Sequence, residues 1–179
     1  MAKKKAIFTI GHSTRSLEEF VDLLAANGIE RLVDVRTIPR SKRNPQFNSD
    51  NLCSGLEKHN ISYLHMKELG GLRHPKKDSV NLGWHNDSFR GYADCMQGPE
   101  FSDALDTLIQ LAKDQPTAIM CAEAVPWRCH RSLIADALTV RGYEVKNIIS
   151  RTSSKEHSLN PMAVIDEGRV TYPAEAIRS

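Results

Sequence analysis

The feature that most constrains the fold is a strand–helix–strand pattern near the start of the chain. The apolar run 6–10 ends at Gly11 and is typical of a buried strand. Ser16 and Glu19 have the spacing of a capping box, which predicts the first turn of a helix. A second buried strand is predicted at 31–35. Strands joined by a helix in this way pair in parallel, so we expect an α/β protein with a mainly parallel sheet.

The same alternation continues along the chain. Further elements are expected as strands at 61–66, 117–121 and 145–150, and as helices at 51–58, at 88–96, from Pro99, and from near Cys129 to Gly142. Glycines and prolines interrupt residues 67–86, which predicts an irregular loop. The tail 163–173 is expected to form a small hairpin that turns at Glu167-Gly168. We therefore expect a single three-layer α/β domain over residues 1–179.

The charge of the chain is weak overall but concentrated locally. The net charge is only +2, so binding of an anion must depend on local clusters. Two basic stretches are visible, RTIPRSKR at 36–43 and RHPKK at 73–77. Two interpretations stay open, because such stretches form either solvated loops or a surface that faces phosphates.

The sequence also bears on location. The apolar run after the basic start has five residues, too few for a signal peptide, and no run approaches a membrane span. We expect a cytoplasmic protein that does not contact a membrane. Its four cysteines, Cys53, Cys95, Cys121 and Cys129, are then expected to be reduced thiols. The sequence does not determine the oligomeric state.

Polar residues stand where several predicted strands end. His12 and Ser13 follow the first strand, Asp34 and Arg36 end the second, and Glu123 follows the strand at 117–121. Ligands of open parallel sheets bind beyond the carboxyl ends of the strands, so we expect a shared crevice here. Each residue also has a structural interpretation; Asp34 and Arg36, for example, suit an ion pair.

The stretch CAEAVPWRCHR combines a thiol, an imidazole and a guanidinium at the predicted start of a helix. The N-terminus of a helix lowers the pKa of a thiol and binds anions, and Arg131 adds a two-pronged donor. Cys129 is a candidate nucleophile with His130 or Glu123 as proton carrier, or else a small buried residue. Neighbours on a helix diverge by about 100°, so we expect that Cys129, His130 and Arg131 do not all face one ligand.

Other familiar patterns are absent. The sequence contains no Walker A motif, dinucleotide fingerprint or HExxH, so no cofactor is indicated. The gap between Cys121 and Cys129 does not match zinc-knuckle spacing, and we predict no metal site. Arg90 and Tyr92 lie among aromatic residues in or near the predicted loops. Such a mixture suits stacking on a base, and it suits a self-packed loop equally well.

Five ordered motifs resemble those of the domain of unknown function 488 family: TIGHSTRSLEEF, LVDVRTIPRSKR, ISYLHMKELGG, FRGYADCM and CAEAVPWRCHRSLIADAL. The resemblance runs from about residue 7 to 150 and reaches the tail through His157 and the closing Tyr172-Pro173. It implies a compact α/β domain and carries no established activity. The motif positions include most of the residues that the strand-end argument selects.

These patterns favour an enzyme that acts on a phosphorylated or nucleotide-like ligand. Glu123 is the expected general base and His12 a second proton carrier, while Asp34 orients a neighbouring arginine or histidine. The anion would be held by Arg36, Arg40 and Arg131, and Ser13, Arg90, Tyr92 and His130 are further candidate ligand contacts. One rival is a non-catalytic nucleic-acid-binding module. The other is a thiol-based redox protein that depends on Cys129.

Overall fold

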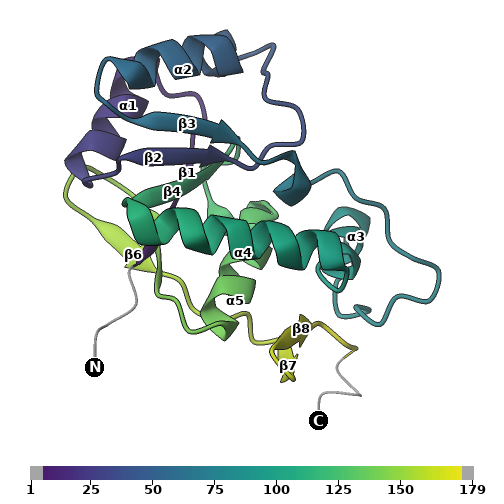
Figure 1. Cartoon of the computed structure of the whole chain (residues 1–179). Coiled ribbons are helices and arrows are strands. Elements are labelled where there is room, and N and C mark those ends of the chain that lie inside the picture. The colour runs from purple at the N-terminus through teal and green to yellow at the C-terminus, as the bar shows by residue number, and fades with distance from the viewer. Residues whose placement is uncertain (1–5, 175–179) are drawn as a thin grey trace, which may run out of the picture.

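The computed structural model describes residues 6–174, which form a twisted sheet covered on both faces by helices (Figure 1). The strand order is β3-β2-β4-β1-β5-β6. The strands are β1 (Ile7–Gly11), β2 (Arg31–Asp34), β3 (Ser62–His65), β4 (Thr117–Cys121), β5 (Val145–Ile148) and β6 (Ser154–Glu156). All neighbours pair in parallel except β6, which pairs antiparallel with β5. The predicted α/β class with a mainly parallel sheet is confirmed.

Two helices cover each face of the sheet (Figure 1). Helices α1 (Leu17–Ala26) and α2 (Ser49–Glu57) pack on one face, and α4 (Pro99–Asp114) and α5 (Arg131–Val140) pack on the other. Helix α3 (Asp87–Cys95) joins the core on the α4 side. Short 3₁₀ turns lie at η1 (Pro45–Phe47), η2 (Lys67–Leu69) and η3 (Pro126–Arg128). This arrangement confirms the three-layer prediction.

The local signals of the sequence explain why these elements form. The Ser16 side chain accepts a hydrogen bond from the Glu19 amide and caps α1. Pro99 stands in the first turn of α4, where its missing N–H is not needed. The C-terminal hairpin of β7 (Val164–Asp166) and β8 (Arg169–Thr171) turns at Glu167-Gly168, both with positive φ, which suits a type I′ turn.

Three local differences separate the structure from the sequence prediction. Helix α5 begins at Arg131 rather than near Cys129, because η3 occupies the preceding residues. Strand β5 stops at Ile148, two residues before its predicted end. Strand β6 was not predicted, because its three exposed residues carry no hydrophobic pattern.

The core consists of two apolar layers, one on each face of the sheet. The layer under α1 and α2 contains Ile10, Leu32 and Phe47, and the layer under α4 and α5 contains Val33 and Ile119. Side chains alternate along each strand, so neighbouring residues at a strand end belong to different layers. Among residues 6–174, no helix is both long and apolar enough to cross a membrane.

Candidate functional site

Asp34 and Arg36 form a buried ion pair on the α1 and α2 face of the sheet. The Arg36 Nε lies 2.9 and 3.1 Å from the two Asp34 carboxylate oxygens, and its Nη2 lies 2.7 Å from one of them. Tyr63 donates a fourth side-chain hydrogen bond to this carboxylate, at 2.6 Å. Burial and this bond to the carboxylate raise the pKa of the Tyr63 hydroxyl. Asp34 therefore orients Arg36, and its own oxygens are already engaged.

His12 lies beside this pair and is almost fully buried. Its ring stacks on Phe47 with centroids 4.3 Å apart, and its Nδ1 lies 2.8 Å from the Ser13 carbonyl oxygen. A carbonyl only accepts, so Nδ1 carries the proton and Nε2 presents a lone pair. Nε2 has no hydrogen-bond partner, and neither has Arg36 Nη1. Burial, with the positive charge of Arg36, holds the pKa of His12 below its ordinary value.

Cys121, Cys129 and His130 meet on the opposite face, at the end of β4. The two sulfur atoms lie 2.7 Å apart, and His130 Nδ1 lies 3.4 Å from the Cys129 Sγ. The His130 Nε2 donates to the Val35 carbonyl oxygen at 2.8 Å, so Nδ1 is left as an acceptor toward the thiol. Burial lowers the pKa of His130 to about 4. The imidazole is therefore neutral at physiological pH.

Cys129, His130 and Arg131 do not stand on one helix, because α5 begins only at Arg131, and of the three only Arg131 lines the cavity beside α5. Cys129 precedes the helix in extended backbone, and His130 occupies its N-cap position. The Arg131 amide lies 3.5 Å from the Cys129 Sγ. The imidazole and the backbone of the arginine thus both contact one sulfur atom.

Arg131 is the largest fully buried side chain among the described residues. Its Nη2 makes one long hydrogen bond of 3.4 Å, to the Glu123 carbonyl oxygen. Its Nε and Nη1 are buried and have no hydrogen-bond partner. A buried cation without a counter-ion is unfavourable unless something supplies an acceptor. This guanidinium is therefore the least satisfied charged group in the described structure.

Glu123 presents its backbone rather than its side chain to this region. The side chain is exposed, and no ion pair joins it to Arg131 among residues 6–174. Its carbonyl oxygen instead packs against Gly11, where an added Cβ would lie only 1.7 Å away. This close approach requires glycine at the end of β1.

The remaining sequence candidates lie outside these clusters. Arg40 is exposed on the loop after β2. Arg90 donates to the Trp84 carbonyl oxygen at 3.0 Å and pairs with Asp87 at 3.7 Å. Tyr92 is buried and donates to the Leu69 carbonyl oxygen at 2.8 Å, with its ring tilted against His130.

A cavity of about 730 Å³ lies beside α5 and is called the α5 cavity. It is bounded by β1, β5, the loop that contains η3, and the segment 155–161. Its polar and aromatic lining comprises Thr9, Arg15, Trp84, Trp127, Arg131, Ser132, Asp136, Asn147, Lys155, Glu156, His157, Ser158 and Asn160. Of the residues predicted from sequence, only Arg131 lines it.

Three buried donors without partners belong to residues that line the α5 cavity. They are the Nε and Nη1 of Arg131 and the indole Nε1 of Trp84. Arg15 and Lys155 add two further positive charges to the wall. Trp127, 67% exposed, stands at its edge. The lining therefore combines hydrogen-bond donors, three positively charged side chains, the carboxylates of Asp136 and Glu156, and a flat aromatic surface.

A histidine–aspartate pair, to which sequence analysis assigned no role in the site, also lines the α5 cavity. The His157 Nε2 lies 2.7 Å from an Asp136 carboxylate oxygen, and Tyr172 donates to the other oxygen at 2.7 Å. Asp136 thus fixes the imidazole with its proton on Nε2 and a lone pair on Nδ1. His157 follows β6, the strand without a sequence pattern. Asp136 stands on α5, one helical turn after Ser132, which lines the same cavity. This position on the helix was the only feature of the sequence that could have indicated Asp136.

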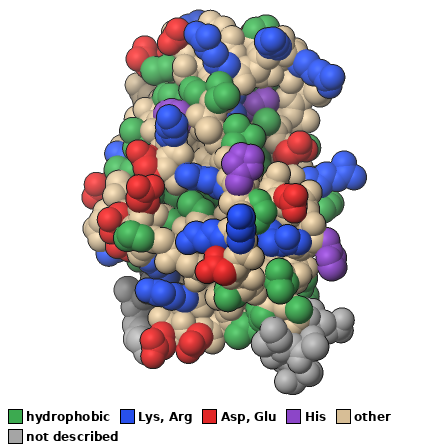
Figure 2. Space-filling model, turned by 90° about the vertical axis from the view of Figure 1, so that its right-hand side faces the viewer, with side chains coloured by type: hydrophobic (Ala, Val, Ile, Leu, Met, Phe, Trp, Pro, Cys, Tyr) green, Lys and Arg blue, Asp and Glu red, His purple; other side chains and the backbone are tan. Residues whose placement is uncertain are grey.

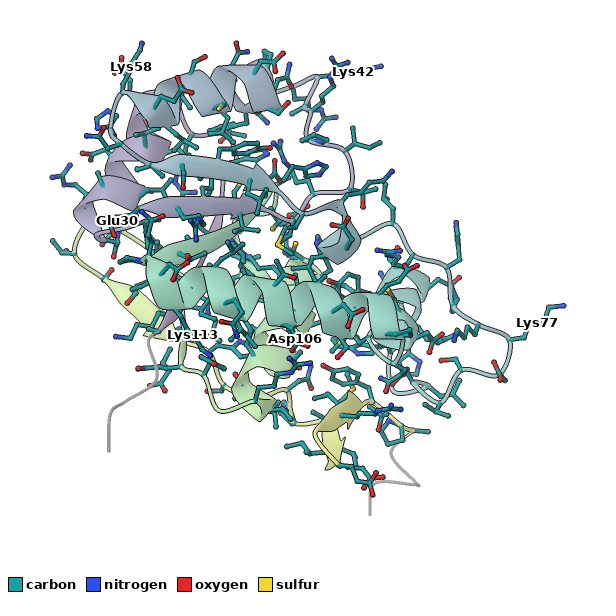
Figure 3. All side chains as sticks on the ribbon, viewed as in Figure 1. Glu30, Lys42, Lys58, Lys77, Asp106 and Lys113 are labelled. Atoms are coloured by element: carbon teal, nitrogen blue, oxygen red, sulfur yellow. The ribbon has the colours of Figure 1, made fainter. Side chains whose placement is uncertain are left out.

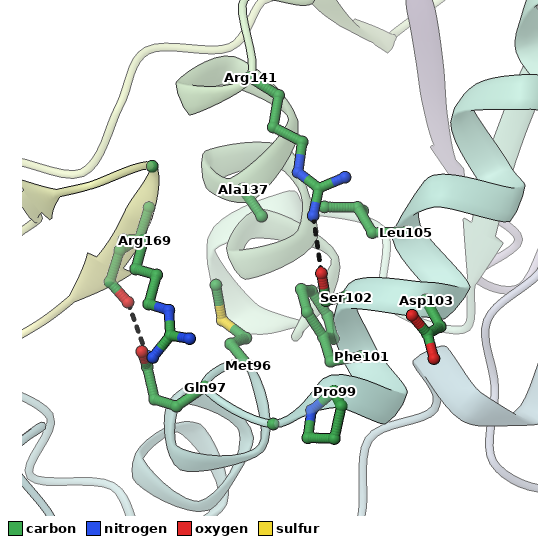
Figure 4. Close-up of a pocket in the computed structure, with 13 residues that line it drawn as sticks. Met96, Gln97, Pro99, Phe101, Ser102, Asp103, Leu105, Ala137, Arg141 and Arg169 are labelled. Carbon is green, nitrogen blue, oxygen red and sulfur yellow. Dashed lines mark hydrogen bonds between the residues drawn. The ribbon is translucent and has the colours of Figure 1, made fainter.

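A smaller cavity of about 300 Å³ lies away from the strand ends, between the start of α4, the end of α5 and β8 (Figure 4). Arg141 reaches into it and donates to the Ser102 hydroxyl at 3.1 Å, besides pairing with Asp106. Gln97 closes one side through a 2.7 Å hydrogen bond to the Val170 carbonyl oxygen. The polar side chains of Gln97, Ser102 and Arg141 are thus already engaged in hydrogen bonds.

Basic side chains surround the edge of the sheet at which the parallel strands end. Figure 2 faces this edge and shows lysine and arginine side chains spread across it. Lys42 and Lys77 project outward from the two loops predicted to be basic (Figure 3). Among residues 6–174, no group of three or more histidine, cysteine or acidic side chains is arranged to hold a metal ion.

The model of one protein family, described as Domain of unknown function DUF488, matches residues 16–138. The chain belongs to this family. No curated protein and no solved structure matches the chain. The DUF488 match spans α1 to α5 and so includes both cysteines of the sulfur cluster, Arg131 and Asp136. It excludes Thr9, Arg15, Asn147, Lys155 and His157, which complete the α5 cavity.

Proposed function

We propose that the protein is an enzyme that binds a small phosphorylated ligand of nucleotide size in the α5 cavity. The observation that carries the proposal is the buried Arg131 guanidinium, whose Nε and Nη1 have no acceptor. Phosphate oxygens accept two parallel hydrogen bonds from a guanidinium, a geometry that lysine does not offer. A phosphate group in the cavity would satisfy this charge.

The composition of the cavity wall supports a nucleotide-like ligand. Arg15 and Lys155 add positive charge for a phosphate group. The exposed indole of Trp127 offers a surface for stacking an aromatic base, and the unpartnered Trp84 N–H offers a donor to an oxygen. A volume of about 730 Å³ lies within the range of small-molecule sites.

The His157–Asp136 pair supports acid–base chemistry on that ligand. Asp136 holds the Nε2 proton, so the Nδ1 lone pair is available to take a proton from water or from a hydroxyl group. Water that has given a proton to His157 would attack the phosphorus atom, and the P–O bond to the nucleoside would break. The departing nucleoside oxygen would take the proton from His157 and phosphate would be released, while Arg131 balances the charge that develops on the phosphate oxygens. In this scheme His157 takes the role of general base that sequence analysis gave to Glu123.

Binding of adenosine monophosphate and inorganic phosphate, followed by calorimetry, tests the ligand proposal. Arg131→Lys keeps the charge but removes the fork of donors, so we expect affinity for the nucleotide to fall about tenfold or more. Arg15→Ala and Lys155→Ala should weaken binding less. Lys77→Ala changes an exposed lysine outside the cavity and is the matched control. Equal affinity in all four variants, or no binding by the unaltered protein, would overturn the proposal.

Release of phosphate from nucleoside monophosphates tests the catalytic role of His157. His157→Gln should keep an amide near Asp136 but remove the basic lone pair, so we expect binding without turnover. Glu123→Gln should retain turnover, because its side chain is outside the cavity. The reverse pattern would restore Glu123 as the general base.

A second candidate function, binding of nucleic acid without catalysis, is favoured by the exposed basic loops. Arg40, Lys42 and Arg43 are exposed, and none forms an ion pair among the described residues. Several contacts to phosphates would give a steep decrease of affinity with salt. Absence of binding to DNA and RNA at low salt would exclude this function.

A further inference from the structure

The two sulfur atoms at the end of β4 are arranged for a reaction with each other. Cys121 is the last residue of β4, and Cys129 comes directly after η3. Residues 122–128 lie between the two cysteines. Their Sγ atoms lie 2.7 Å apart, and a disulfide bond measures about 2.05 Å. Cys53 and Cys95 take no part in this contact. Closure of a bond therefore requires little movement of the backbone that carries the two residues.

The surroundings favour ionisation of one of the two thiols. Burial opposes ionisation of Cys121, but the hydrogen bond from Cys129 and the charge of Arg131 outweigh it and lower the pKa of Cys121. The hydrogen bond to Cys121 and burial raise the pKa of Cys129, which keeps its proton. A thiolate beside a thiol is the pairing that thiol oxidation requires, since the thiolate is the nucleophile.

His130 provides a place for the second proton. Its Nδ1 lies 3.4 Å from the Cys129 Sγ, and the hydrogen bond from Nε2 to the Val35 carbonyl oxygen fixes Nδ1 as an acceptor. A Cβ on Gly71 would lie 3.1 Å from this nitrogen, so glycine leaves room for the ring. The proton of Cys129 thus has an acceptor beside it.

We propose that Cys121 and Cys129 form a redox site that reduces hydrogen peroxide and closes to a disulfide. Cys121 and Cys129 are only 1% and 7% exposed, which favours a small oxidant such as peroxide over a bulky one. Neither cysteine lines the α5 cavity, but the redox site shares the charge of Arg131 with the proposed ligand site. It also differs from the nucleophile role of Cys129, because here Cys121 attacks and Cys129 resolves.

The reaction proceeds in two balanced steps. The Cys121 thiolate attacks one peroxide oxygen, the O–O bond breaks, and the departing hydroxide takes a proton from solvent, leaving sulfenic acid on Cys121. Cys129 then passes its proton through His130 and attacks the Cys121 sulfur; the S–O bond breaks and water leaves. Two thiols have lost two electrons, and one peroxide has become two waters.

The experiment uses the full chain with Cys53→Ser and Cys95→Ser, so that only the pair remains. Peroxide should remove both thiols from titration, lower the mass by two hydrogen atoms and link the peptides that contain Cys121 and Cys129. Dithiothreitol should restore both thiols. Two titratable thiols after peroxide, or sulfinic acid without a linked peptide, would overturn the proposal.

A variant separates the two roles. With Cys129→Ser added, oxidation should stop at sulfenic acid on Cys121, which dimedone traps with a measurable gain of mass. Trapping on Cys129 in the Cys121→Ser variant, with none on Cys121 in the Cys129→Ser variant, would contradict the assignment of the attacking thiol. If either of these variants fails to fold, the protein with only Cys53→Ser and Cys95→Ser still tests whether the disulfide forms.

Discussion

At the scale of single residues, the buried ion pair of Asp34 and Arg36 organises one half of the strand ends. Its atoms join β2 to Tyr63 on β3 and to the Phe47 carbonyl oxygen in η1, at 2.8 Å. Desolvation makes a buried ion pair a weak source of net stability, but removal of one partner leaves a buried charge alone. The pair therefore fixes local geometry more than it adds to stability.

Arg36→Met should leave the Asp34 carboxylate buried without its cation. We expect the free energy of unfolding to fall by about 3–5 kcal/mol, as measured by urea denaturation. Arg40→Met changes an exposed arginine four residues later and should alter it by less than about 0.5 kcal/mol. Similar effects of the two substitutions would mean that the Asp34 charge is satisfied without Arg36.

The sequence locates the ends of the strands along the chain but does not give the direction of the side chains there. His12, Asp34 and Arg36 do stand at strand ends, but they lie on the α1 and α2 face, away from Cys129 and Arg131. The alternation of a strand decides this, and a shift of one residue reverses it. That Arg131 is fully buried also depends on segments distant in sequence, which no local pattern reveals.

At the scale of elements, the structure follows those sequence signals that have a local physical cause. The helix of Ser16 and the hairpin of Glu167-Gly168 form as predicted, because a cap and a positive-φ turn act within a few residues. Strand β6 forms through pairing with β5, a tertiary interaction, so the sequence of β6 alone does not predict it. For the same reason the sequence did not indicate a role in the site for His157, which follows β6.

Ser16→Ala should remove the side-chain acceptor for the Glu19 amide at the start of α1. We expect a loss of about 0.5–2 kcal/mol in the free energy of unfolding, measured by thermal melting followed by circular dichroism. Ser54→Ala lies on an exposed position within α2 and serves as the control, with little change expected. A loss as large in the control would show that the cap does not stabilise α1.

At the scale of the whole molecule, buried histidines couple stability to pH. Burial lowers the pKa of His130 from 6.5 to about 4, and burial likewise lowers that of His12. At a pH between 4 and 6.5, His130 binds a proton in the unfolded chain but not in the folded chain. The free energy of unfolding should therefore decrease as pH falls from about 6.5 toward 4.

Urea denaturation at pH 7 and pH 5 measures this dependence. His130→Gln keeps an amide donor for the Val35 carbonyl oxygen but does not titrate, so we expect it to lose part of the decrease at pH 5. His59→Gln changes an exposed histidine and should retain the full decrease. If His130→Gln retains the full decrease as well, folding does not lower the pKa of His130.

The edges of the sheet also affect how copies of this protein behave toward one another. An open edge offers unpaired backbone groups to the sheet of a neighbouring molecule, which is a route to aggregation. Here β6 covers the edge of β5 with only three residues, and Lys155 and Glu156 place opposite charges on it. A short, charged, antiparallel last strand resists addition of a further strand. The segment that carries Lys155 into the α5 cavity thus also protects this edge of the sheet from pairing with another copy of the chain.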